Sequence, residues 1–169
     1  AVRVRLNDGS EAHFDIVIGA DGLHSAMRGR IMPGAPQPAY SGQSVWRAVL
    51  PRLPEINHTM LWVAATTKVG LNPVSDREMY VFVNENRPAR ARLADDGVVE
   101  GLRALLAPYR VPLVQAARDL IGPDSRIIFR PLEGMLVPLP WHRDRVVLIG
   151  DAVHATTPHL ASGAGIGIE

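Results

Sequence analysis

Two short apolar runs near opposite ends of this 169-residue chain each end in glycine and aspartate, at residues 15–18 and 145–149. Runs of this kind, broken by glycine, are typical of parallel strands that are covered on both faces. Open parallel sheets bind their ligands beyond the carboxyl ends of the strands. Asp21 and Asp151 each follow such a run, so both are expected at a ligand-binding edge.

The residues around the second aspartate favour a cofactor with sugar hydroxyls. A carboxylate at this place accepts hydrogen bonds from such hydroxyls, and glycine lets the backbone approach a ligand closely. Gly163, Ala164 and Gly165 follow Pro158 and lead into the start of a helix. The free N–H groups at a helix start favour negative charge.

The residues between the two runs predict a separate segment of strands and helices. A Pro-rich linker at 33–38 opens it, and turn signals separate the strands as in an antiparallel sheet. Apolar residues at the 3.6-residue period predict two helices, around residues 98–106 and 113–121. A hairpin of residues 2–6 and 11–14 around an Asn-Asp-Gly turn precedes the first run. The remaining strands are expected at 44–50, 60–65, 79–83, 127–129 and 135–137.

Composition excludes several classes of protein. Lys+Arg 18 against Asp+Glu 17, with the arginines scattered along the chain, offers no field for a nucleic acid. The absence of cysteine excludes disulfides and thiolate-bound metals and suits a cytoplasmic location. The apolar runs are too short to span a membrane. The sequence does not indicate an oligomeric state.

The two junctions together resemble the group A flavoprotein monooxygenases, of the p-hydroxybenzoate and salicylate hydroxylase type. The first looks like the family's "DG" motif and the second like its "GD" motif. The matching residues are Gly19, Ala20, Asp21, Gly22, Ser25 and Arg28 in the first, and Gly150, Asp151, Ala152, His154, Pro158, Gly163 and Gly165 in the second. The likeness covers most of the chain.

The resemblance implies a cofactor and a role for each motif. Asp151, after Gly150, would bind the ribityl chain of FAD, and residues 158–167, including Ala164, would pass the isoalloxazine ring. Asp21, Gly22 and Arg28 would lie near the pyrophosphate and would influence both FAD and NAD(P)H.

The fold class is therefore expected to be mixed α/β: a partial FAD-binding, Rossmann-like domain with an inserted mixed-sheet substrate domain. Residues 1–32 and 134–169 would belong to the FAD domain, and residues 33–133 to the substrate domain. The family's N-terminal Gly-x-Gly-x-x-Gly fingerprint is missing, and the chain stops at Glu169 within an expected helix. We therefore expect a piece of a longer protein, inactive on its own. Position 161 is Ala where many members of the family have Gly.

The activity implied is insertion of one oxygen atom of O₂ into a small aromatic substrate, through a flavin C4a-hydroperoxide formed after reduction by NAD(P)H. The alternatives are another flavoprotein oxidoreductase on this scaffold, such as a reductase or epoxidase, or a fragment that cannot hold FAD. No catalytic acid or base is assigned, because the cofactor carries the chemistry.

Other candidate sites are weaker. Asp151, His154 and His159 match no zinc spacing, and Ser25 and Ser162 lie in no Gly-x-Ser-x-Gly elbow, so we expect neither a metal site nor a hydrolase. Trp46 and Arg47 are the candidates for lining a substrate pocket, since an arginine binds an aromatic carboxylate well. A core tryptophan beside a surface arginine explains the pair equally well.

Overall fold

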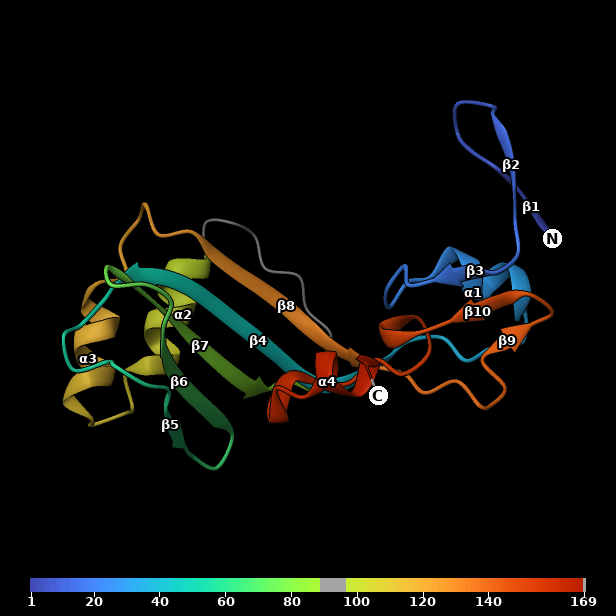
Figure 1. The fold of residues 1–169 in the computed structure, drawn as a ribbon. Coiled ribbons are helices and arrows are strands. Elements are labelled where there is room, and N and C mark those ends of the chain that lie inside the picture. Colours follow the sequence, from blue (N-terminus) through green and yellow to red (C-terminus); the bar gives the residue numbers. More distant parts are fainter. Residues whose placement is uncertain (89–96, 169) are drawn as a thin grey trace. The chain divides into compact units, whose positions relative to one another are not determined.

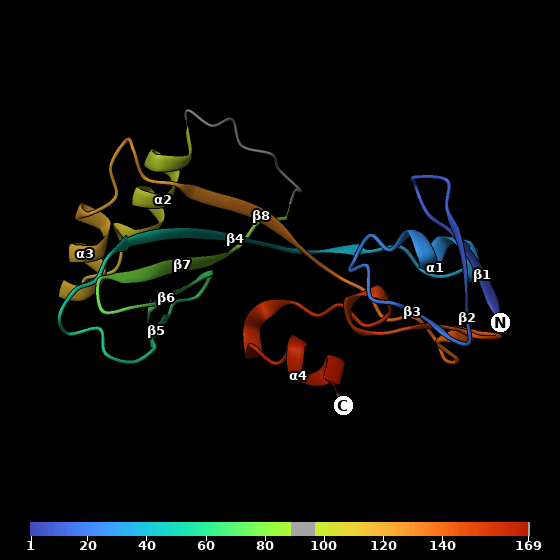
Figure 2. The same cartoon turned by 45° about the horizontal axis from the view of Figure 1, so that its top comes forward.

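The structure is a computed structural model that describes residues 1–88 and 97–168. The chain forms two compact units (Figures 1 and 2). The first, which we call the motif unit, contains residues 1–41 and 133–169, and the second, the sheet unit, contains residues 42–132. The fold class is mixed α/β, as predicted.

A five-stranded sheet in the order β5-β6-β7-β4-β8 dominates the sheet unit (Figure 1). The strands from β5 to β4 are antiparallel neighbours. Their bounds are β4 Ala39–Pro51, β5 Met60–Val63, β6 Thr67–Pro73, β7 Glu78–Asn86 and β8 Ile127–Gly134. Two helices follow β7 in the chain, α2 Val98–Leu106 and α3 Pro112–Asp119.

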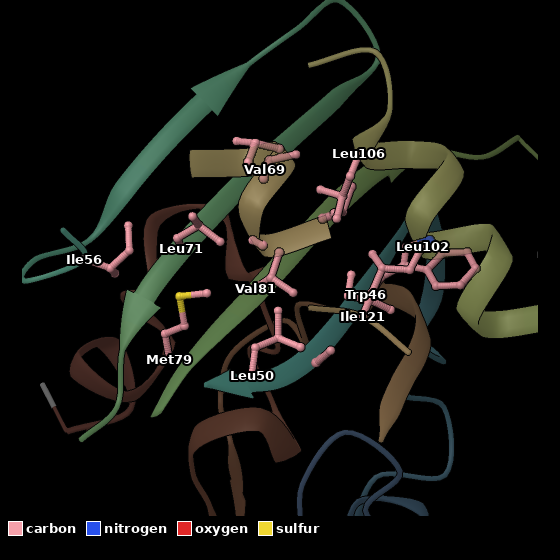
Figure 3. Close-up of a cluster of buried hydrophobic side chains, with 14 residues drawn as sticks. Trp46, Leu50, Ile56, Val69, Leu71, Met79, Val81, Leu102, Leu106 and Ile121 are labelled. Atoms are coloured by element: carbon pink, nitrogen blue, oxygen red, sulfur yellow. The ribbon is translucent and has the colours of Figure 1, made fainter. Parts of the chain in front are cut away.

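The core of the sheet unit lies between one face of the sheet and the two helices. Alternate residues of β4, among them Trp46, Ala48 and Leu50, point into it, because successive side chains of a strand face opposite sides. Leu102 and Leu106 of α2 close it from the helix side, and both are fully buried (Figure 3). The amphipathic pattern of the sequence therefore builds a continuous apolar core here.

Trp46 is the largest side chain of this core. Only 1 % of it is exposed, and its ring packs against Phe129 with 4.7 Å between centroids. Its Nε1–H donates to Glu85 Oε1 at 2.8 Å, and Glu85 also pairs with Arg87. Gly101 of α2 leaves room for the ring, since a Cβ there would come within 2.7 Å of Trp46 Cη2. Trp46 thus fixes how α2 sits on the sheet.

The motif unit has smaller sheets. A hairpin pairs β1 Val2–Arg5 with β2 Glu11–Phe14 around Gly9, whose φ is 87°. A second sheet has the order β3-β10-β9, with β3 Val17–Gly19, β9 His142–Arg143 and β10 Val146–Leu148. Helix α1 Ala26–Ile31 packs on this sheet through Met27 and Ile31, against a small core that includes Leu148. Helix α4 Gly163–Ile168 ends the described chain.

Two sequence predictions about elements are wrong, and one strand was missed. The run at 15–18 is not covered on both faces, because Ile16 and Ile18 are 59 % and 62 % exposed on a sheet that α1 packs against. Residues 135–137 form no strand, although the N–H groups of Met135 and Val137 donate to carbonyls of the loop after β10. The strand β6 was not predicted, because Lys, Gly, Asn and Pro along it disguise the pattern.

The boundaries between the units also differ from those expected. The chain leaves the motif unit after residue 41 and returns to it at residue 133. The Pro-rich residues 33–38 belong to the motif unit, since Ala35 packs on its core and donates its N–H to Met32. The predicted boundaries followed the composition change at residue 32, whereas the backbone contacts continue past it.

Candidate functional site

The two glycine-aspartate junctions lie side by side at one edge of the β3-β10-β9 sheet. Strands β3 and β10 are parallel, and Leu148 is the register partner of Gly19. The backbone of Ile149 continues the pairing, with its N–H donating to the Gly19 carbonyl at 3.0 Å. Both segments turn away from the sheet immediately afterwards, so residues 130 positions apart in the sequence form one edge lined by loops. Parallel sheets bind their ligands at such strand ends.

Each turn depends on a glycine with positive φ. Gly22 has φ 79° and Gly150 has φ 60°, which L side chains rarely adopt. No heavy atom lies within 4 Å of a Cβ built on either glycine. Backbone conformation, and not crowding by the protein, therefore requires glycine at these positions, and the space beside both turns is open.

The Asp21 carboxylate is occupied by helix α1. It accepts the Ser25 hydroxyl at 2.5 Å and the Met27 N–H at 3.0 Å. Partial loss of solvation raises the pKa of Asp21, but these hydrogen bonds together lower it further, so its pKa lies below the usual value. The negative charge of Asp21 thus anchors the start of α1, where the helix dipole also favours it.

Arg28 connects the two junctions. Only 3 % of the residue is exposed, and its guanidinium donates to the Ala152 carbonyl at 2.8 Å and to the Leu23 carbonyl at 2.9 Å. Its backbone N–H donates to Ser25 Oγ, which caps the helix. The arginine of the first motif therefore holds the backbone of the second, although the sequence suggested a role toward the cofactor.

The second junction forms a 3₁₀ turn at Gly150–Ala152, with the Asp151 side chain exposed to solvent. Helix α4 packs against this turn, since a Cβ on Gly167 would lie 3.5 Å from the Gly150 Cα. A Cβ at Gly167 would therefore be in van der Waals contact with the turn. Asp151 is the carboxylate that remains available to a ligand at this edge, because Asp21 is engaged with α1.

His154 lies buried behind the turn. Its ring packs on Trp141 with 5.2 Å between centroids, and its N–H donates to the Gly150 carbonyl at 3.0 Å. Its Nδ1 is buried without a hydrogen-bond partner within the described residues. The histidine thus supports the turn through packing, and its own Nδ1 is the polar atom left without a partner.

The segment after the turn presents open backbone. Pro158–Leu160 forms a 3₁₀ turn, and Ala161 follows in the left-handed region at φ 52°. A Cβ on Gly163 would meet only Thr156 Oγ1, at 3.5 Å, and one on Gly165 would meet nothing within 4 Å. A planar ligand could approach this backbone closely. The exposed Asp151 carboxylate can accept hydrogen bonds, and the backbone of the glycine turns and of this segment is open to a ligand. These are groups of the kinds that fit FAD.

The structure separates the two predicted substrate residues. Trp46 points into the core of the sheet unit, and Arg47 points to the opposite face of the sheet. Arg47 lines a groove of about 500 Å³ on that face, together with Tyr80 and Arg126, which sequence reasoning did not single out. No sequence signal connects these three residues, because Arg126 directly precedes β8 and only the pairing of β4 with β7 and β8 brings them together.

Two features are absent from residues 1–88 and 97–168. No group of three or more His, Asp or Glu side chains there gathers at a point where it could hold a metal ion. No helix in the same ranges is long and apolar enough to cross a membrane.

The edge described above has the features expected of a flavin site, and comparison with known proteins shows the family. The family described as FAD binding domain matches residues 1–169, so the chain belongs to this family. The 2-heptyl-3-hydroxy-4(1H)-quinolone synthase of Pseudomonas aeruginosa is 35 % identical over 170 residues, which are 99 % of this chain and 44 % of that protein. The 3-amino-4-hydroxybenzoate 2-monooxygenase of Streptomyces cremeus is 30 % identical over 175 residues, 100 % of this chain and 42 % of that protein.

A solved structure shows the same fold. HpxO of Klebsiella pneumoniae, complexed with FAD and uric acid, superposes with a TM-score of 0.81 at 29 % identity, over 98 % of this chain and 43 % of that one. The chain thus spans less than half the length of these relatives. The resemblance drawn from the two motifs is confirmed, and so is the class of cofactor.

Proposed function

We propose that the protein containing this chain is an FAD-dependent monooxygenase that transfers one oxygen atom of O₂ to a small aromatic substrate, with NAD(P)H as reductant and by the flavin-bound oxygen route that the resemblance implies. The observation that carries this proposal is the parallel pairing of β3 and β10, which brings the two motifs to one edge. Membership of the FAD binding domain family supports it. Relatives named as a quinolone synthase and a hydroxybenzoate monooxygenase support an aromatic substrate.

The residues of the motif unit divide into those that bind and those that support. We assign the ribityl hydroxyls to Asp151, because its carboxylate is exposed beside the open turn at Gly150. The backbone from Pro158 through Gly163, Ala164 and Gly165 would line the flavin ring. Backbone N–H groups there would favour negative charge on the reduced ring. When bound, FAD supplies the redox chemistry, and these residues orient it.

The residues of the first motif act mainly through the backbone. Gly22 leaves space at the edge for a phosphate group, and Asp21 keeps α1 in place. Arg28 fixes the distance between the two loops through its bonds to Ala152 and Leu23. A pyrophosphate near this edge would also feel the positive charge of Arg28, because water screens a buried charge little.

Flavin content tests the proposal. The complete protein containing these residues, purified and supplied with FAD, should be yellow and should consume NADH or NADPH and O₂ when an aromatic substrate is added. Asp151→Asn should weaken FAD binding about tenfold, which corresponds to the loss of one good charge-assisted hydrogen bond. Asp124→Asn, an exposed aspartate of the sheet unit, is the matched control and should leave FAD affinity unchanged.

Three results would count against the proposal. A protein that stays colourless with FAD present would refute the flavoprotein assignment. Equal FAD affinity in Asp151→Asn and Asp124→Asn would refute the role of Asp151. A yellow protein that oxidises NAD(P)H without transferring oxygen to any aromatic compound would favour the reductase alternative.

A further inference from the structure

A second cavity, of about 520 Å³, lies wholly within the motif unit. Its walls come from the start of β1, the last turn of α1 and the turn that joins β9 to β10 (Figure 1). The volume falls within the range of small-molecule sites, about 300–1,000 Å³. Strand β10 begins at Val146 in this cavity and leads to the turn at Gly150. The cavity therefore lies at the other end of β10 from the proposed cofactor edge.

Positive charge is concentrated in this cavity. Four arginines line it, whereas only one carboxylate does among the described residues, that of Asp144. The chain as a whole has a net charge of only +1. The arginines come from three separate parts of the sequence, so the fold gathers a charge that is scattered along the chain. They are Arg3, Arg30, Arg143 and Arg145.

The guanidinium groups can reach a ligand. Arg30 and Arg143 are exposed and form no hydrogen bond or ion pair within the part of the chain that the structure describes. Arg145 gives one N–H to a backbone carbonyl at 3.2 Å, which leaves its other donors unused. Arg3 lies 3.9 Å from a carboxylate oxygen of Glu11, and both side chains are exposed, so this pair contributes little and an anion can replace it.

The arrangement suits phosphate better than carboxylate. Arginine binds either anion with two N–H donors at once, but a phosphate presents more acceptor oxygens and more charge. It can therefore accept from arginines of different walls. Val2, Ile31 and Val146 line the same cavity and are half-buried, so an organic group joined to the phosphate would meet apolar side chains.

We propose that this cavity binds a phosphate group, either as the free anion or as part of a small organic phosphate. Arg30 and Arg143 donate to the phosphate oxygens, and Arg3 and Arg145 add positive charge. The inference goes beyond the proposed monooxygenase function and does not depend on it, since the cavity contains none of the residues assigned to FAD.

The experiment measures anion binding away from the cofactor edge. Inorganic phosphate, and acetate as the reference anion, are titrated calorimetrically into the complete protein containing these residues, with and without FAD, at equal ionic strength. Phosphate should bind about tenfold more tightly than acetate, and added salt should weaken it. Arg30→Gln and Arg143→Gln should each weaken phosphate binding about three- to tenfold and leave the affinity for FAD unchanged.

A control variant and a second probe complete the test. Arg110→Gln, an exposed arginine between α2 and α3, is the matched control and should leave phosphate affinity unchanged. All three substituted side chains are exposed, so the variants should keep the thermal stability of the parent. Phenyl phosphate distinguishes the two sources of the phosphate group: tighter binding than that of inorganic phosphate supports an organic phosphate, and equal binding supports the free anion.

The outcomes are separate from those of the proposed function. A phosphate affinity no greater than that for acetate overturns the assignment, and so does one that survives both Arg30→Gln and Arg143→Gln. Phosphate binding that FAD abolishes would place the anion at the cofactor edge and would also overturn it. Binding that persists with FAD present and depends on both arginines supports the site, whether or not the protein transfers oxygen to an aromatic compound.

Discussion

The sheet unit has a large apolar core, whereas the motif unit has a small one and leaves many of its apolar side chains in water. In the sheet unit, β4, β6, β7, α2 and α3 supply one continuous core of fully buried residues. The core of the motif unit is much smaller, and Phe14, Ile16, Ile18 and Ile149 are among its exposed apolar residues. Packing therefore contributes more to the stability of the sheet unit, since buried apolar area is the main favourable term in folding.

The motif unit relies more on polar links that act over short distances. Its two loops are joined by the buried Arg28, and its first helix is held by Asp21 and Ser25. Two of its glycines adopt positive φ in the turns that would face the cofactor. A unit built in this way gains more from a bound ligand, because ligand binding adds stability to the folded state alone. The larger core suits the sheet unit to the role of a scaffold, and the polar links suit the motif unit to the cofactor binding proposed above.

The sharpest way to break this comparison is to remove the centre of the larger core. Trp46→Ala should destabilise the sheet unit by about 3–5 kcal/mol, because it leaves a cavity between α2 and the sheet. It also removes the Trp46 donor to Glu85 Oε1, which keeps its bond from Arg87. Urea unfolding followed by amide exchange should show faster exchange at Val81 and Val83, with little change at Val147. Val49→Ala, on the exposed face, is the control and should cost under about 0.5 kcal/mol. Equal effects of the two substitutions would contradict the assignment of Trp46 to the core.

The counterpart in the motif unit removes a polar link. Arg28→Met keeps most of the side-chain volume but removes both bonds to the Ala152 and Leu23 carbonyls, and should cost about 2–4 kcal/mol. The loss should appear as faster amide exchange in β3 and β10 and weaker FAD loading, with the sheet unit unchanged. Arg30→Met, on the exposed side of the same helix, should have little effect. If both variants behaved alike, Arg28 would not be the link between the loops.

The same contrast explains how much the sequence predicted. Local and periodic patterns predicted well: the hairpin around Gly9, both helices of the sheet unit and the two strands that end in glycine and aspartate are all present. The strand β6 was not predicted, in part because it contains Gly70. The Phe82 ring of the neighbouring strand fills the space of a side chain there, and no single run of residues reveals this contact. The bond from Arg28 to Ala152 and the proximity of Tyr80 and Arg126 to Arg47 could not be predicted, since these residues are far apart in the chain. The sequence predicted which residues belong to the two motifs. Their hydrogen-bond partners became visible only in the folded structure.

A smaller effect is expected where the loop before α4 adopts an unusual backbone. Ala161 has φ 52° and ψ 23°, a left-handed conformation that costs a residue with a Cβ about 1 kcal/mol. Ala161→Gly should therefore stabilise the motif unit by up to about 1 kcal/mol, even after the greater freedom of glycine in the unfolded chain is counted. Ala164→Gly in α4 is the matched control and should destabilise by about 0.5 kcal/mol, because its backbone is helical. Thermal unfolding should give shifts of opposite sign, and shifts of the same sign would rule out backbone strain at Ala161.

The smallest effect concerns the exposed carboxylate at the start of α1. Hydrogen bonds hold the pKa of Asp21 below its ordinary value of 3.8, which the unfolded chain retains. The folded state therefore binds this proton less readily, and the contribution of Asp21 to stability is complete above about pH 4 and is lost as the pH falls through the lower folded pKa. Asp21→Asn should lower the stability of the motif unit at pH 7, where the contribution of Asp21 is complete, and should make that stability less steep in pH below about 4. Asp144→Asn, an exposed aspartate of the same unit, should leave the slope as it is. A slope that is unaltered in Asp21→Asn would mean that other carboxylates govern acid unfolding of this unit, and that Asp21 anchors α1 by geometry and not by charge.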